Sequence, residues 1–245
     1  MPQSKISKIE NGHQTATVAD VEALADALRV APAVKTDLID QASALQTETH
    51  PWRVLHRPSF RKRQDDIRRM EQAATTFRLF QPNVIPGLLQ TAEYARHVLT
   101  VGGFGLDNMS DAVASRLERQ TALYDQGKTF RFVVTEGALR WRLCPVPVHL
   151  AAIDRVANLS TLGNVQVGVI PLDAFTPASQ TNMFCVLDDR VVLVETITTE
   201  LTLKDRKDID RYLAAFDALD ALAHHDDEAR ATLDRIASDL RRMGD

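Results

Sequence analysis

The sequence lacks several features that mark common classes of protein. Its 245 residues include only two cysteines, Cys144 and Cys185, which are far apart and lack the spacing of metal ligands. We therefore expect two small buried side chains in a reduced, cytoplasmic protein. No stretch holds the roughly 18 apolar residues that a membrane-spanning helix needs. No positively charged start leads into an apolar run, which argues against a secretory signal and a membrane partner.

Recognised catalytic motifs are also missing. There is no HExxH zinc motif, no GxSxG nucleophile turn and no phosphate-binding P-loop, and the glycine-rich loop 102–105 lacks GxGxxG spacing. His224–Asp227 contains metal-ligating residue types, but four adjacent residues at a helix end point in different directions, so we interpret them as a solvated helix junction. We predict no catalytic residue, no metal and no cofactor, and the sequence favours a protein that is not an enzyme.

An excess of positive charge is absent as well. The net charge of −4 argues against a protein that coats nucleic acid through bulk charge. The charge is unevenly distributed, however, because residues 1–69 contain 11 Lys and Arg against 9 Asp and Glu, while the remainder has 18 against 24. An anionic partner would therefore be tolerated best at the front of the chain.

The first residues have the pattern of a short helix. Ile6 and Ile9 are three apart and share one face, and Asn11–Gly12 supplies a left-handed stop. Polar or cationic residues occupy the remaining positions, namely Gln3, Ser4, Lys5, Ser7 and Lys8. A second helix is predicted over 19–28, capped by Thr17, and a third over 34–45. The apolar positions expected to be buried in this third helix are Leu38, Ile39, Ala42 and Leu45.

A connector with two prolines, 50–58, follows these helices and begins a basic stretch. The basic residues are Arg53, Arg57, Arg61, Lys62, Arg63, Arg68 and Arg69. We expect a long helix over 61–77 with Ile67, Met70, Ala74 and Phe77 on its core face. The basic run is either a solvated helix face or a phosphate contact beside the N-terminal helices, and the sequence leaves both open.

The rest of the chain mixes helices and strands. Extended segments are predicted within 79–85 and over 130–135, 165–170, 183–187 and 191–195, and helices over 88–99, 109–124, 148–162, 207–223 and 227–243. The predicted class is therefore α+β, with a short all-α front followed by a larger domain that has a small sheet and flanking helices. We place a partial helix-turn-helix domain at 1–49, a connector at 50–60 and the α+β domain at 61–245.

Ser4–Gly12 (SKISKIENG) is similar to the recognition-helix segment of XRE-type (Cro/C1-like) helix-turn-helix regulators, and 17–28 resembles the helix that follows it. Such domains place two helices before this segment, one of which crosses the DNA backbone. The sequence has neither, so we expect a truncated form of the domain. The resemblance implies that Gln3 and Ser4 reach base edges, that Lys5 contacts a guanine or a phosphate, and that Ser7 and Lys8 hold phosphates.

A second resemblance covers most of the chain. Residues 80–96 (FQPNVIPGLLQTAEYAR), 116–120 (RLERQ), 136–140 (EGALR) and 164–167 (NVQV) are similar to segments of the actinobacterial family DUF5753. Members of that family pair this domain with an N-terminal XRE domain and are regarded as transcriptional regulators. The resemblance implies a DNA-binding regulator whose large domain senses a ligand or partner, and which dimerises to match two half-sites.

Glu136, Trp141, Arg142 and Glu195 are the candidates for a ligand pocket in the large domain. The first three follow a predicted strand, and Glu195 ends a hydrophobic strand where a functional carboxylate can sit. An ion pair or surface cluster explains them equally well. Two alternatives to a regulator stay open: a small-molecule-binding protein or biosynthetic enzyme that has lost DNA binding, and an interaction module for a small protein partner.

Overall fold

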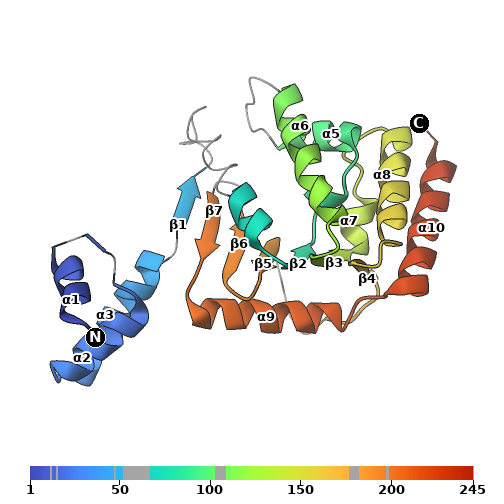
Figure 1. The fold of residues 1–245 in the computed structure, drawn as a ribbon. Helices are drawn as coiled ribbons and strands as arrows, with labels where there is room; N and C mark the ends of the chain where they lie inside the picture. Colours follow the sequence, from blue (N-terminus) through green and yellow to red (C-terminus); the bar gives the residue numbers. More distant parts are fainter. Residues whose placement is uncertain are drawn as a thin grey trace.

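The computed structural model describes residues 1–11, 13–14, 16–46, 48–51, 67–102, 109–176, 182–196 and 199–244. Three N-terminal helices precede a larger part built on one mixed sheet with helices on both faces (Figure 1). This arrangement confirms the predicted α+β class. None of the described helices is both long and apolar enough to cross a membrane.

The N-terminal helices are α1 (Gln3–Glu10), α2 (Val18–Ala27) and α3 (Pro32–Gln46). Helix α2 begins with a capping box, because the Thr17 hydroxyl accepts from the Asp20 amide and the Asp20 carboxylate accepts from the Thr17 amide. Of the predicted left-handed stop at Asn11–Gly12, Gly12 lies outside the described residues. Asn11 itself has a φ of −88°, and its side-chain amide donates to the Ser7 carbonyl at 2.7 Å. Burial on α3 is also less than predicted, because Ala42 is buried but Leu38 is exposed.

Seven strands form the sheet, in the order β1-β7-β6-β5-β2-β3-β4. They are β1 (Glu48–Pro51), β2 (Thr76–Gln81), β3 (Thr129–Thr135), β4 (Val165–Ile170), β5 (Phe184–Leu187), β6 (Val191–Glu195) and β7 (Thr199–Leu203). Strands β2, β3 and β4 are parallel, and the other neighbours are antiparallel. Strands β2, β3 and β4 are therefore neighbours both in the chain and in the sheet, and β5, which follows β4 in the chain, pairs with the other side of β2.

Different helices pack against the two faces of this sheet. Helix α9 (Arg206–Asp220) lies along one face, where Ile209, Phe216 and Leu219 pack on inward side chains such as Val133 and Val192 (Figure 1). The opposite face of the sheet packs against the larger apolar core. The elements on that side are α5 (Ala92–Val101), α6 (Met109–Arg119), α7 (Glu136–Arg140), α8 (Val146–Leu159), α10 (Asp226–Met243) and the 3-10 helices Gly87–Leu89 and Gln120–Tyr124.

The long helix expected over 61–77 is shorter in the structure, because the helical residues end at 73 and strand β2 begins at Thr76. Lys128 explains this end: its ammonium donates to the carbonyls of Glu71 and Gln72 at 3.1 and 2.8 Å, and also to that of Ala74. Phe77 then pairs with β3 and stacks on Phe130, with ring centroids 4.5 Å apart. Tertiary pairing has overridden the helical pattern.

Two strands were not predicted, β1 and β7. Strand β1 falls partly within the expected connector and lies at the edge of the sheet, where Pro51 is tolerated because one side of an edge strand needs no ladder bonds. The turn predicted at 188–190 is confirmed. Asp188 and Asp189 have φ values of 49° and 54°, and Arg190 N donates to the Leu187 carbonyl at 3.0 Å, as in a type I′ hairpin.

Candidate functional site

Helix α1 has an outer and an inner face. The outer face consists of Gln3, Ser4, Ser7 and Lys8, which are all exposed. These positions form two i, i+4 pairs, so their side chains stand side by side on the helix. Lys5, Ile6 and Ile9 are half-buried on the other side. Four of the five predicted DNA contacts therefore share one free surface.

Lys5 differs from the other four predicted contacts. Its ammonium donates to the Asp20 carboxylate at 2.6 Å and thereby links α1 to α2. The hydrogen bonds from Lys5 and Thr17 lower the pKa of Asp20 to about 2. Lys5 is thus engaged in the packing of the N-terminal helices, whereas Lys8 forms no ion pair with any residue that the structure describes.

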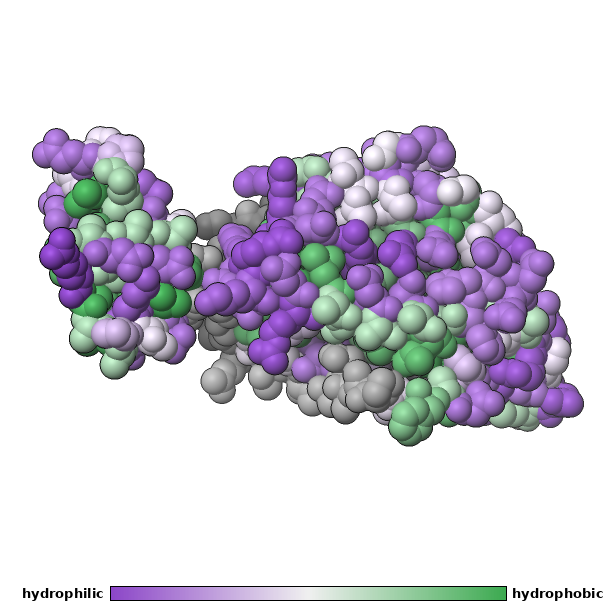
Figure 2. All heavy atoms as spheres, turned by 90° about the horizontal axis from the view of Figure 1, so that it is seen from below, coloured by the Kyte–Doolittle hydropathy of each residue, from purple (hydrophilic) through white to green (hydrophobic). Residues whose placement is uncertain are grey.

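The N-terminal helices bury few side chains. Helix α1 has no buried residue, and the buried residues of α2 are Asp20 and Ala25. Large apolar side chains remain at the surface, among them Leu28 at 74% and Val34 at 49% exposure. Figure 2 shows several apolar areas among the hydrophilic ones on the N-terminal helices.

The basic stretch is only partly within the described residues, since Arg53, Arg57, Arg61, Lys62 and Arg63 lie outside them. Arg68 makes a two-pronged contact with Glu118, at 2.7 and 3.2 Å. This contact fits a surface ion pair for Arg68, and the phosphate interpretation of the remaining basic residues stays a prediction.

Glu136, the first of the predicted ligand residues, is buried within an ion-pair network. Its carboxylate accepts from Arg140 at 2.7 Å, from Arg235 on α10 at 3.1 Å and from the Leu172 amide at 3.1 Å. Burial would raise the pKa of Glu136, but these hydrogen bonds and the neighbouring arginines outweigh it and lower the pKa below its usual range. The network ties α7 to α10, because Arg140 also contacts Asp239 at 2.9 Å.

The other three predicted residues lie at two different places. Trp141 and Arg142 follow α7 and are exposed, Trp141 at 60%. Glu195 ends β6 and is exposed, and its charge acts on Arg116 and Arg119 of α6. The charge of Glu195 thus acts on two arginines of α6, whereas the other three residues lie at α7. A shared ligand pocket for the four stays a prediction.

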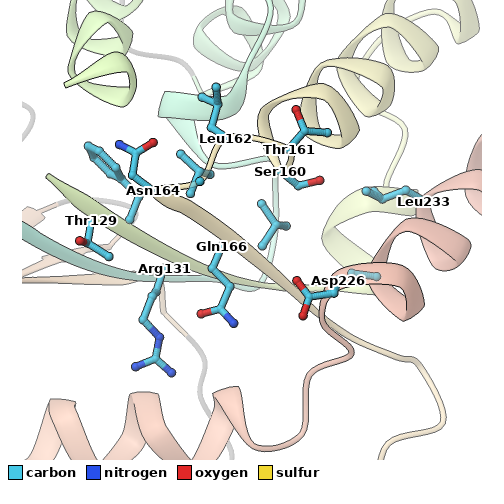
Figure 3. A pocket seen from close by; sticks show the side chains of 14 residues that line it. Thr129, Arg131, Ser160, Thr161, Leu162, Asn164, Gln166, Asp226 and Leu233 are labelled. Atoms are coloured by element: carbon cyan, nitrogen blue, oxygen red, sulfur yellow. The ribbon is translucent and has the colours of Figure 1, made fainter. Parts of the chain in front are cut away.

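A pocket of about 450 Å³ lies along the edge strand β4, and none of those four residues lines it. In Figure 3 Arg131 and Gln166 point toward α9, while Leu162 and Asn164 lie on the opposite side of the strand. Its strongest polar groups already have protein partners. Arg131 pairs with Asp220, and the Asn164 amide donates to the carbonyls of Leu123, Asp125 and Lys128 at 3.0–3.1 Å. We therefore do not place the ligand site here.

The junction at His224–Asp227 is part of the fold. His224 forms a backbone bridge with Val169, and the His225 ring lies so close to Gly168 that a Cβ there would be 2.6 Å from its Cε1. Gly168 therefore gives His225 its place next to the sheet. No cluster of three or more His, Cys, Asp or Glu side chains suited to a metal ion occurs in the described part of the chain.

A network of glutamines and arginines joins two segments that carry the family resemblance. Gln90 and Gln120 are both buried. The Gln120 amide donates to the carbonyls of Gly87 and Gln90 at 3.1 and 2.8 Å. Arg116 donates to Gln90 Oε1 at 3.0 Å, and Arg155 of α8 donates to Gln120 Oε1 at 3.2 Å. Two guanidinium groups are thus held by two buried side-chain amides.

Our sequence analysis did not identify this network as a site. Gln90, Arg116 and Gln120 belong to the segments 80–96 and 116–120, so the motifs contained a signal. Arg155 lies outside all the motifs, and only the packing of α8 brings it to Gln120. The network is a polar cluster of the large domain that includes two positively charged side chains.

The protein family described as "Domain of unknown function (DUF5753)" matches residues 64–235. No curated protein matches the sequence. Three solved structures resemble it weakly. NucT from Helicobacter pylori is 7% identical with a TM-score of 0.45, and the match covers 74% of this chain and 98% of that one. Nuc from Salmonella typhimurium, a phospholipase D family member, is 11% identical with a TM-score of 0.41, covering 74% and 97%.

TrmBL2, an archaeal chromatin protein described as showing a novel mode of DNA binding, is 13% identical with a TM-score of 0.38. That match covers 83% of this chain and 65% of TrmBL2. Likenesses at this level carry no argument about activity or partners.

Proposed function

The chain belongs to the DUF5753 family, and we propose that it is a cytoplasmic transcriptional regulator that contacts DNA through α1 and senses a ligand or a protein partner through its large domain. The observation that supports this most is the division of α1 into two faces. Gln3, Ser4, Ser7 and Lys8 are exposed on the outside, while Lys5 fixes the helix to Asp20.

This surface has the chemistry that major-groove recognition needs. Gln3 and Ser4 supply donors and acceptors for base edges, and Lys8 supplies a positive charge for a phosphate. Lys5 takes a positioning role, because its ammonium already binds Asp20 at 2.6 Å. We further propose that 1–49 acts as the DNA-binding unit, that 50–60 links it to 61–245, and that two copies associate to match two half-sites.

DNA binding is tested with the 245-residue chain and DNA from the region upstream of its own gene, by fluorescence anisotropy at several salt concentrations. We expect Lys8→Ala to weaken binding and to reduce the slope of log K against log salt by about 0.9, the loss of one phosphate contact. Lys35→Ala is the matched control, because Lys35 lies on α3 and pairs with Asp26 instead. Binding without salt dependence, or equal effects of the two variants, would contradict the proposal.

A second candidate function is a small-molecule-binding protein that does not bind DNA. The thin packing of α1, which has no buried residue, favours this reading. It predicts no anisotropy change with any promoter fragment, together with saturable ligand binding by the large domain. A co-purifying small protein would instead favour a partner-binding module.

A further inference from the structure

Two arginines of the large domain have no negatively charged partner among the residues that the structure describes. Arg116 has one hydrogen bond, to Gln90, and Arg155 has one, to Gln120. No carboxylate among the described residues lies within 4.0 Å of either guanidinium. Each guanidinium carries five N–H donors, so most of the donors on both side chains are unused.

Neighbouring Arg119 shows what a paired arginine looks like in the same helix. Its guanidinium contacts Glu71 through Nε and Nη2, at 2.8 and 2.5 Å. Burial alone would lower the pKa of Arg119, but the Glu71 carboxylate more than compensates. Burial likewise lowers the pKa of Arg116, and the charge of Glu195 offsets this only in part. Arg116 is therefore a partly desolvated cation that no carboxylate of the described residues contacts, and an unpaired charge is costly to desolvate.

The unused donors can be reached from solution. Both arginines are only half-buried, and none of their nitrogens is both sealed from solvent and without a partner. The supporting amides, in contrast, are fixed: Gln90 is 1% and Gln120 is 4% exposed. Gln90 also donates to the Ile85 carbonyl at 2.7 Å, so its Oε1 must face Arg116. The buried amides thus preorganise the two guanidinium groups, which are partly accessible to solvent.

We propose that Arg116 and Arg155 bind the oxyanion group, a carboxylate or a phosphate, of a small ligand. Both groups accept paired hydrogen bonds from guanidinium, which a single chloride ion cannot reproduce. The amide oxygens of Gln90 and Gln120 orient the two guanidinium groups without neutralising them, so the positive charge stays available to the ligand. That this ligand is an effector of DNA binding rests on the proposed function, whereas the binding itself does not.

A substitution of Glu195 should change the affinity for anions in the opposite direction to a substitution of Arg116. Its carboxylate is exposed at the end of β6 and reduces the positive potential at Arg116. Removing that charge should therefore strengthen the binding of an anion, whereas removing Arg116 should weaken it. A substitution at the exposed end of a strand also leaves the core intact, so Glu195→Gln tests the site even where an arginine variant is unstable.

The experiment measures the thermal unfolding of the full chain against inorganic phosphate and, separately, succinate, with sodium chloride at equal ionic strength as reference. The two series show whether phosphate or carboxylate is preferred. We expect both to stabilise the protein beyond chloride. Arg116→Gln should raise the half-saturating anion concentration at least tenfold, because a charged contact of this kind is worth a factor of ten or more. Arg155→Gln should raise that concentration severalfold. Glu195→Gln should lower it about threefold, because it removes a negative charge that acts on Arg116 without contacting the ligand.

Arg96→Gln is the matched control, because it removes the same charge from an arginine of α5 that is also half-buried but is paired with Glu93. Its half-saturating concentration should equal that of the wild type. Equal effects of Arg96→Gln and Arg116→Gln, no advantage of phosphate and succinate over chloride, or unchanged binding in Glu195→Gln would each overturn the site. The unfolding experiment contains no DNA, so it tests the anion site independently of DNA binding. If the protein bound anions but not DNA, the anion site would stand and only its proposed role in regulating DNA binding would fail.

Discussion

The N-terminal helices and the sheet domain hold themselves together in different ways. Helix α10 alone buries six residues, and the apolar core on its side of the sheet extends through α8 to β2, β3 and β4. Helix α1 buries none and is joined to α2 by the contact of Lys5 with Asp20. Helix capping and an ion pair hold the N-terminal helices together, whereas apolar burial holds the sheet domain together.

This difference matters for function. A large core gives the sheet domain the rigidity needed to hold Gln90 and Gln120, and through them two arginines, in place. The small N-terminal unit instead leaves most of its side chains at the surface, including the outer face of α1. We expect the two regions to respond differently to core, capping and pH changes, in the following order of effect.

The largest effect is expected from Phe130→Ala. Phe130 is fully buried between Phe77 and Phe132, so its loss should reduce the free energy of unfolding of the sheet domain by about 3–5 kcal/mol. Urea unfolding followed by circular dichroism measures this. Phe175→Ala is the control, because Phe175 is 88% exposed and its removal should change stability by less than about 0.5 kcal/mol. Equal losses would show that the core is not organised as described.

Lys128→Met should have the next largest effect. It leaves the carbonyls of Glu71, Gln72 and Ala74 without their buried donor, at a cost of about 1–3 kcal/mol in the same unfolding experiment. Lys207→Met, an exposed change on α9, should be close to neutral. A neutral Lys128→Met would mean that the end of the helical segment 67–73 does not depend on this cap.

Thr17→Ala should destabilise α2 by about 1 kcal/mol, because it removes the capping box. Hydrogen exchange of the α2 amides should quicken, while the unfolding midpoint of the sheet domain stays constant. Thr17→Ser retains the hydroxyl and should behave like the wild type. If Thr17→Ala shifted the sheet domain as well, the two regions would be one cooperative unit and the contrast between them would fail.

The smallest effect is a pH dependence confined to the N-terminal helices. Because the folded state lowers the pKa of Asp20 to about 2 from 3.8, its contribution to stability is complete above pH 3.8 and is lost as the pH falls toward 2. An NMR titration should show the α1 and α2 amides shifting in that window. Asp20→Asn should abolish the transition, and a transition that persists in this variant would assign it to another group.

Local pattern decided much of the secondary structure. The spacing of Ile6 and Ile9 defined α1, Thr17 marked the start of α2, and the β-branched and aromatic residues of 130–135 and 165–170 defined β3 and β4, which the structure confirms. These signals depend on neighbours in the chain, so they can be read from a single sequence. The polar outer face of α1 was predictable for the same reason.

Only the tertiary structure decided the rest. Strand β1 exists because β7 pairs with it, and the helix predicted through Phe77 ends early because Lys128 caps it and β3 pairs with the following residues. The sequence alone pointed to Glu195 as a candidate site residue, but it could not show that the charge of Glu195 acts on Arg116 or that Arg155 donates to Gln120. Whether a charged side chain is paired depends on residues distant in the chain, and packing alone brings those residues together.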